Sequence, residues 1–166
     1  MAENIFKLLV KYNKEINQEM NNIIKTLTDE EWNRRFSGYY KSIHELCSHI
    51  FIWDYIWLSR LKSAGNFSSL NGSYFNREYN FRELLFENID EYLAKRPELD
   101  DVLINFVNEI TADILTKEAK WTDSEGAQCR EKVEMILIHV SNHQTHHRGM
   151  ISLYLESLGK ENDYSR

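Results

Sequence analysis

Four of the six histidines fall within nine residues, in a segment predicted to be helical from about residue 132 to 158. Each helical residue is rotated by about 100° from the one before it, so the apolar positions of this segment define one buried stripe. His143 and His147, one turn apart, face that stripe, whereas His139 and His146 lie on its flank. An inward pair of this kind is either a buried hydrogen-bonding pair or half of a metal site. An unpaired buried ring is costly, and neutral imidazole is the commonest protein metal ligand.

A third inward histidine is predicted on a helix from about Ile43 to Lys62. Ser42 and Glu45 have the spacing of a capping box, in which the hydroxyl bonds a free amide and the glutamate reaches back. His49 lies at the edge of the apolar stripe of this helix, one turn from Trp53. Trp53 either walls a pocket beside His49 or belongs to the core, and its helical spacing is compatible with both.

His44 falls roughly 140° from His49 around the same predicted helix, so we expect a solvated surface residue. His44, Glu45 and His49 superficially resemble the His-Glu-x-x-His motif of zinc proteases. The two histidines are five residues apart rather than four, so their rings cannot bind one ion from a single helix face. The sequence therefore argues against that motif.

Histidines on two facing helices can reach one ion, because neighbouring helices in a bundle lie roughly 8–10 Å apart. His49 is the remaining histidine on an inward edge outside the last helix. His49, His143 and His147 therefore form a candidate divalent-metal site with an open coordination position. Such a site suits catalysis, since structural zinc sites normally fill all four positions. The sequence has no Glu-x-x-His pair, which argues against a ferritin-like di-iron centre.

The other periodic segments predict the remaining helices of an all-α protein. Apolar residues recur every three or four positions from about Glu3 to Leu27, which predicts the first helix. Residues 80–83 resemble a helix cap, followed by a helix that Pro97 kinks or restarts and that ends near Thr111. Together with the segments that carry the histidines, these helices predict a four-helix bundle.

Two irregular stretches interrupt the helical pattern. Segments 116–122 and 127–130 flank a turn signal and predict a small β-hairpin before the last helix. Residues 63–80 are predicted to form a long loop, which is either a plain crossover connection or a lid over a binding site. The length of 166 residues predicts one domain over residues 1–166.

The composition is that of a globular protein, with 42% hydrophobic residues and a formal net charge of −6. Nucleic-acid partners are not expected, because the phosphate backbone demands clustered lysine and arginine. No apolar run approaches the length of a membrane span, so no membrane association is expected either. Cys47 and Cys129 are far apart without a Cys-x-x-Cys spacing, which predicts free thiols and a cytoplasmic location.

Several of these motifs resemble the DinB/YfiT-like metalloenzyme family. The most specific is the run at residues 139–149, and weaker matches are Tyr12-Asn13 with Asn17, residues 27–32, Ser42-Ile43 with His49, and the turn at 123–126. The resemblance covers nearly the whole chain, although residues 65–95 match poorly. One departure is Met150, where the family often has glutamine after Arg-Gly.

The resemblance implies a four-helix bundle with an unusual crossover connection, usually as a homodimer. It also implies a divalent metal, commonly nickel or zinc, on His49, His143 and His147. Relatives include S-transferases that use low-molecular-weight thiols. Met150 puts in doubt any chemistry that depends on the missing glutamine.

Two functions are therefore expected as alternatives. The first is a metal-dependent enzyme that acts on a small-molecule substrate, a thiol S-transferase or a hydrolase, because a bound divalent ion creates a nucleophile from thiol or water at neutral pH. The second is a metal-binding stress-response protein without catalysis, since the sequence names no general acid or base. His139 and His146 are expected at most to support the ligands. Arg148 either holds an anionic group or forms a surface salt bridge.

Overall fold

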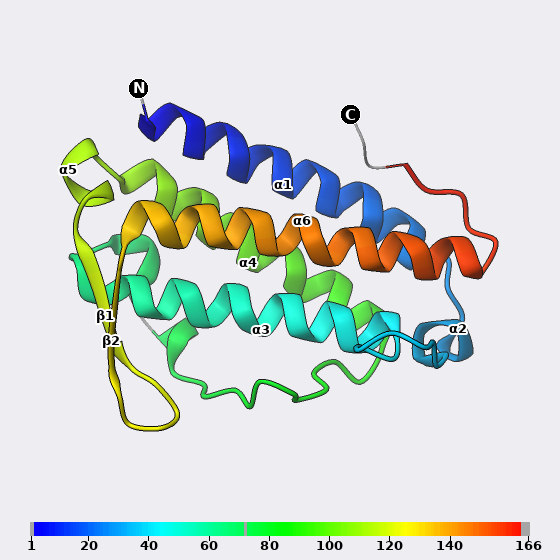
Figure 1. Ribbon diagram of the computed structural model, residues 1–166. Coiled ribbons are helices and arrows are strands. Elements are labelled where there is room, and N and C mark those ends of the chain that lie inside the picture. Colours follow the sequence, from blue (N-terminus) through cyan, green and yellow to red (C-terminus); the bar gives the residue numbers. More distant parts are fainter. Residues whose placement is uncertain (1, 72, 164–166) are drawn as a thin grey trace.

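The computed structural model describes residues 2–71 and 73–163, and within them the chain forms a bundle of α-helices with one β-hairpin (Figure 1). The long helices are α1 (Ala2–Ile24), α3 (Ile43–Leu61), α4 (Ile89–Glu109) and α6 (Val133–Ser157). The short helices are α2 (Asp29–Asn33) and α5 (Ala112–Leu115), and the hairpin strands are β1 (Glu118–Thr122) and β2 (Gln128–Lys132). The predicted all-α class, with a hairpin directly before the last helix, is confirmed.

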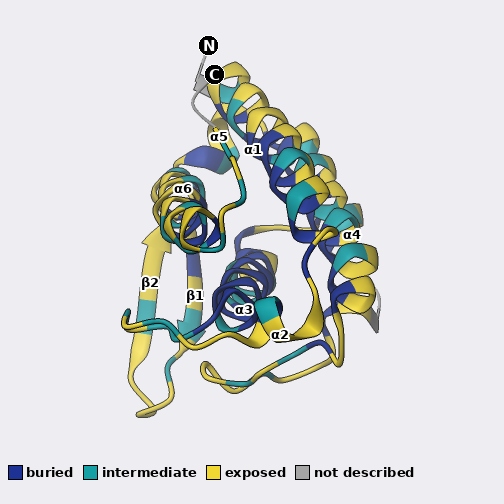
Figure 2. Cartoon of the chain, turned by 90° about the vertical axis from the view of Figure 1, so that its right-hand side faces the viewer, coloured by how far each residue is buried: buried dark blue, intermediate teal, exposed yellow. Residues whose placement is uncertain are grey.

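The four long helices surround one core, seen nearly end-on in Figure 2 with the buried residues turned inward. α1 packs against α4 and α6, and α3 packs against the same two helices. The successive helices α1 and α3 therefore lie at opposite corners of the bundle, and so do α4 and α6. This is a crossover connectivity, and it makes α3 and α6 neighbours although they are far apart in the sequence.

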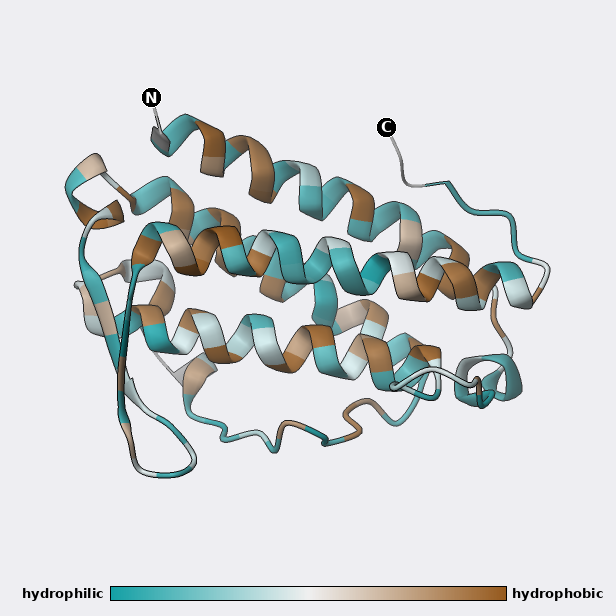
Figure 3. Cartoon of the chain, viewed as in Figure 1, coloured by the Kyte–Doolittle hydropathy of each residue, from teal (hydrophilic) through white to brown (hydrophobic). Residues whose placement is uncertain are grey.

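The middle of α6 differs in polarity from its two ends. Figure 3 shows hydrophobic residues towards both ends of α6 and a hydrophilic stretch between them, although this stretch lies between α1 and α3. Gln144, His147 and Arg148 are buried there. Buried polar groups need partners inside the protein, so this stretch has to be matched by polar side chains from the facing helices.

Local chemistry explains where the two histidine-bearing helices begin and end. The Ser42 hydroxyl accepts a hydrogen bond from the Glu45 amide at 3.1 Å, which starts α3 as predicted. The Glu45 carboxylate accepts from the Lys41 amide at 2.6 Å, so the reciprocal half of the predicted box is displaced by one residue. Gly159 follows the end of α6 with a φ of +74°, in the left-handed region that favours glycine.

The start of α4 differs from the prediction. The Asn80 side chain accepts from the Arg82 amide and forms a local turn, whereas α4 begins after Asn88, whose side chain caps its first turn. The connection from α3 to α4 therefore extends past residues 63–80. Pro97 lies inside α4, which continues through it, so the restart, one of the two alternatives at Pro97, is wrong. Proline has no backbone N–H, so α4 lacks one hydrogen bond at Pro97, and the packing of the helix against its neighbours offsets this loss.

The hairpin is shifted slightly from its predicted position. β1 begins two residues later than expected, β2 ends two residues later, and Trp121 pairs with Cys129 in the antiparallel register. β2 leads directly into α6, so the hairpin sets where the histidine helix starts. Within the described ranges 2–71 and 73–163, no helix is both long enough and apolar enough to cross a membrane.

Candidate metal centre

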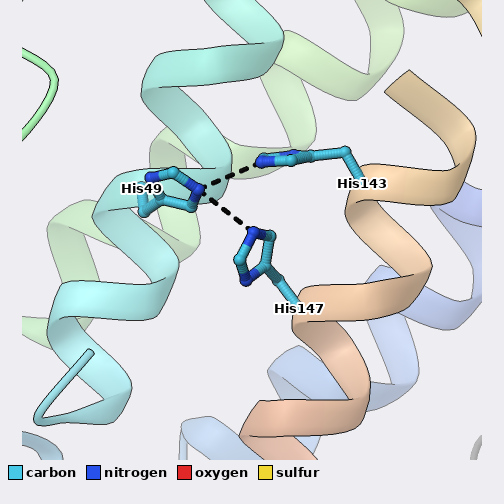
Figure 4. A group of neighbouring side chains, drawn as sticks. All are labelled: His49, His143 and His147. Carbon is cyan, nitrogen blue, oxygen red and sulfur yellow. Dashed lines mark hydrogen bonds between the residues drawn. The ribbon is translucent and has the colours of Figure 1, made fainter. Parts of the chain in front are cut away.

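Three histidine side chains converge between α3 and α6 (Figure 4). His49 projects from α3, and His143 and His147 project from successive turns of α6. Nε2 of His49 lies 3.0 Å from Nε2 of His143 and 3.1 Å from Nε2 of His147. Of the residues that the structure describes, these three form the one group with metal-ligand geometry, with one donor atom of each within 4.8 Å of the others.

The cluster fits a divalent ion in both distance and donor chemistry. Two nitrogens bound to one tetrahedral zinc lie roughly 3.3 Å apart, given Zn–N bonds of about 2.0–2.1 Å. The two observed separations, 3.0 and 3.1 Å, are slightly below that value. Neutral rings facing one another cannot satisfy all their nitrogens mutually, whereas a single cation accepts three lone pairs at once. An all-imidazole set suits zinc and nickel.

Burial keeps the three rings neutral at physiological pH. Loss of solvation, with a smaller contribution from the nearby His147, lowers the pKa of His49 to about 4. Desolvation likewise lowers the pKa of His143 and of His147 to about 3, with smaller contributions from neighbouring histidines. Neutral imidazole is the form that binds a metal, so the cluster does not have to release protons first.

The two flanking histidines touch the cluster through ring packing. The His139 ring stacks on His143 with centroids 5.7 Å apart, and the His146 ring meets His147 edge-on at 4.8 Å. Neither supplies a hydrogen bond to a candidate ligand, because Nδ1 of His143 and Nδ1 of His147 have no partner among the described residues. The supporting role of His139 and His146 stays a prediction.

Tyr40 also belongs to the cluster, and the sequence analysis missed it. Its hydroxyl lies 2.8 Å from Nδ1 and 3.0 Å from Nε2 of His49, and its ring meets that of His147 edge-on. The Tyr154 hydroxyl donates to the Tyr40 carbonyl at 2.6 Å, which ties the segment before α3 to α6. The one available signal was its position two residues before the Ser42 cap, at the end of α3 nearer His49.

A pocket of about 540 Å³ lies beside His49. Trp53 is half-buried, lines this pocket and stacks on Phe81 with ring centroids 5.1 Å apart. Trp53 therefore walls a pocket, the first of the two alternatives. Residues 81–84 of the connection to α4 border the pocket, whereas the described residues of 63–80 (63–71 and 73–80) do not contribute to its lining. The part of this connection that lines the pocket therefore lies further along the chain than residues 63–80, and a lid formed by residues 63–80 stays a prediction.

Arg148 is buried and turned away from this pocket. Its guanidinium donates to Asn13 at 2.7 Å and to Asn17 at 3.1 Å on α1, and to Gln144 at 3.2 Å. The expectation of a surface salt bridge is therefore wrong. The reason is that α1 covers this face of α6 and supplies amide oxygens as acceptors. Arg148 does not line the pocket beside His49.

A buried ion-paired group continues this network towards α3 and α4. The Arg96 guanidinium donates to Asp54 at 2.7 Å and also to Asp100, and Gln144 donates to Asp54 at 2.9 Å. Burial outweighs the attraction of Arg96 and raises the pKa of Asp54 to about 6. Gln144 directly follows His143, so these bonds hold α6 in register against α3 at the level of the histidines.

His44 is buried, so the expected surface position is wrong. Nδ1 of His44 donates to the Asn33 side-chain oxygen at 3.0 Å, and its ring stacks on Trp32 with centroids 4.9 Å apart. Both partners belong to α2, which packs on the face of α3 that the helical periodicity assigns to solvent. Desolvation lowers the pKa of His44 below its ordinary value.

The sequence comparisons agree with this architecture. The model of the DinB family matches residues 1–164. The chain belongs to the DinB family. Its similarity to Protein DinB of Bacillus subtilis (strain 168) is 26% identity over 159 residues, which covers 96% of this chain and 88% of that protein.

Within this DinB chain, Met150 is half-buried and packs against the hydrophobic core. The family match over residues 1–164 confirms the resemblance noted from the motifs. Met150, which stands where the family often has glutamine, contributes to packing of the core.

Proposed function

We propose that this DinB-family chain is a divalent-metal-dependent enzyme in which His49, His143 and His147 bind one zinc or nickel ion. The observation that supports it most strongly is the convergence of three neutral ring nitrogens beside an aromatic pocket. A metal held by three neutral histidines lowers the pKa of a thiol or water at its remaining position, which yields a nucleophile at neutral pH.

The residues around the cluster have separate tasks in this proposal. The three imidazoles hold the ion, and the buried contacts of Gln144 keep their two helices in register. The Tyr40 hydroxyl, within hydrogen-bonding distance of His49, faces the reacting end of the pocket. Burial raises its pKa to about 12, so it is protonated and able to donate a hydrogen bond. Trp53 and Phe81 exclude water from one side of the substrate.

The proposed reaction is transfer of a low-molecular-weight thiol onto a small electrophile, with hydrolysis by activated water as the related alternative. One feature favours a non-catalytic metal-binding stress protein instead. Both acids that border the pocket are engaged, Glu45 with Arg35 and Glu83 with Arg77, so neither is a free general base. Thiol transfer is compatible with this arrangement, because a metal held by the three histidines would itself lower the pKa of a thiol and so replace a separate base.

The experiment uses protein purified without a polyhistidine tag, because the tag itself binds metals. Metal content is measured first, and the zinc- and nickel-loaded protein is then screened with cellular thiols and a test electrophile. We expect turnover that depends on metal and disappears in His143→Ala. His146→Ala is the matched control, because His146 is exposed on the same helix beside a candidate ligand. Metal binding without turnover across the thiol panel supports the non-catalytic alternative.

A homodimer and a cytoplasmic location complete the proposal. Cys47 is a buried free thiol and Cys129 is a half-buried one, which is compatible with a reducing compartment. Sedimentation analysis of the metal-loaded protein tests the dimer directly.

A further inference from the structure

The pocket beside His49 combines apolar walls with an uneven distribution of charge. Its lining comes from three parts of the chain: the segment before α3, residues 45–53 of α3 and the connection before α4. These parts contribute Tyr39, Tyr40, Glu45, His49, Trp53, Phe81, Arg82, Glu83 and Leu84. The volume of about 540 Å³ falls in the range of small-molecule sites.

The rim of the pocket exposes an unusual amount of apolar surface. Tyr39 is 71% exposed, Leu84 is 54% exposed and Phe81 is 40% exposed. Phe81 stacks on Trp53 with an interplanar angle of 11°, so the two rings cover each other's facing sides and together form an aromatic stack on one side of the pocket, called the wall below. A planar or apolar body lying against this wall removes that surface from water, which favours binding.

The wall is held in place from both sides. The Arg77 amide donates to the Tyr55 hydroxyl at 3.1 Å, and the Leu85 amide donates to the Ser48 hydroxyl at 3.1 Å. Phe86 is buried against Phe51, with ring centroids 5.3 Å apart. Residues 81–84 are thus positioned before any ligand arrives, which reduces the entropy lost on binding.

The negative charges at the pocket are already compensated. Glu45 pairs with Arg35 and accepts from the Lys41 amide. Glu83 pairs with Arg77 and accepts from the Asn80 amide. Neither carboxylate offers an unpaired negative charge to a ligand.

Arg82 is the opposite case. Its guanidinium donates to the Tyr39 hydroxyl at 3.0 Å, and over residues 2–71 and 73–163 it forms no ion pair. Its positive charge also acts on Tyr40, where it opposes the rise in pKa that burial causes. Arg82 and Tyr40, whose phenol contacts His49, line the same pocket.

A divalent ion at the histidine cluster would add to the positive charge that Arg82 brings to the pocket. Three neutral imidazoles leave the two charges of a divalent ion uncompensated, and the histidine group includes no carboxylate or thiolate. A ligand that brings negative charge to both ends of the pocket is favoured over a neutral or cationic one of the same shape.

We propose that this pocket binds an amphipathic carboxylate: a small molecule with a planar apolar body that packs on Trp53 and Phe81, a carboxylate that pairs with Arg82, and a donor atom that reaches the three-histidine centre. The donor end rests on the proposed function, whereas the body and the carboxylate do not. Arg82 thus selects the substrate and takes no part in the reaction itself.

The test uses 4-(sulfanylmethyl)benzoate and its neutral amide, which share a thiol donor and a flat ring. Binding to the cobalt-loaded, tag-free protein is followed by the sulfur-to-cobalt absorption band, and binding to the metal-free protein by tryptophan fluorescence. We expect the acid to bind about fivefold more tightly than the amide, the effect of one partly exposed ion pair, and less so at high salt. The preference should be present in both forms of the protein.

Arg82→Gln should bring the ratio of the two dissociation constants to about one while leaving the affinity for the amide unchanged. Arg130→Gln is the matched control, since Arg130 is an exposed arginine on β2, and it should retain the preference. The proposal is overturned if Arg82→Gln prefers the acid over the amide as strongly as the native protein does. It is also overturned if the native protein binds the amide more tightly than the acid. If the native protein does not bind cobalt but its metal-free form still prefers the acid over the amide, the proposed function is overturned instead.

Discussion

The Nε2 atoms of His49 and His143 lie 3.0 Å apart although the two residues are separated by 94 positions in the chain. Two facing helices create this contact, and His147 extends it by one turn of α6. The same helices are held together next to it by Gln144 and Asp54. The histidine cluster, the pocket beside His49 and the buried polar network therefore lie at one level of the bundle, and the expectations below test each part separately.

Removal of any one of the three histidines should abolish stable binding of one divalent ion. We expect His49→Ala, His143→Ala and His147→Ala each to weaken binding by more than the roughly 10–100-fold that loss of an outer-sphere partner costs. Calorimetric titration of tag-free protein with zinc or nickel measures this. His146→Ala should still bind the ion, with at most the loss of affinity expected for an outer-sphere partner. If it loses the ion while His147→Ala keeps it, the assignment of the inward face of α6 is wrong.

Metal should also stabilise the native fold, because the three rings come together only when α3 and α6 are packed. An ion at 100 times its dissociation constant adds about 2.7 kcal/mol to the free energy of unfolding. We expect a corresponding rise in the thermal midpoint with added zinc, and its reversal by a chelator. His143→Ala should show no rise, and a rise of equal size in that variant would place the stabilising ion elsewhere.

Truncation of Arg96 should be strongly destabilising. Arg96 is 1% exposed between Asp54 and Asp100, so Arg96→Met leaves two buried carboxylates without their cation. We expect a loss of about 3–5 kcal/mol in the free energy of unfolding, measured by urea denaturation. Lys95→Met is the matched control on α4, because Lys95 and its partner Glu98 are about half exposed. That change should cost less than ~1 kcal/mol.

Acidification should destabilise the protein in part through His44. Burial lowers the pKa of His44 below 6.5, so the unfolded chain binds a proton that the folded chain excludes. The free energy of unfolding is therefore expected to fall as the pH drops below about 6.5. His44→Gln should reduce the slope of stability against pH in this window. An unchanged slope would mean that His44 takes up its proton in the folded state.

Local sequence patterns were enough to predict the four long helices, apart from the start of α4, and the inward face of α6. Helical periodicity depends only on backbone geometry, so the placement of His143 and His147 on one face, with His139 and His146 beside it, follows from their spacing. The Ser42 cap and the glycine after α6 are likewise local, because their hydrogen bonds and dihedral angles involve residues a few positions apart.

Tertiary packing decided the residues around the site, and it did so through contacts that no short window contains. His44 is buried because α2 packs over it, and Arg148 is buried because α1 supplies asparagines opposite it. Tyr40 and Phe81 reach the site from irregular segments, whose course depends on anchors elsewhere in the fold. Periodicity assigns each helix one buried face, whereas a helix in this bundle is covered by several neighbours at once. The sequence by itself therefore determined which side chains share a helix face, and the fold determined what each face meets.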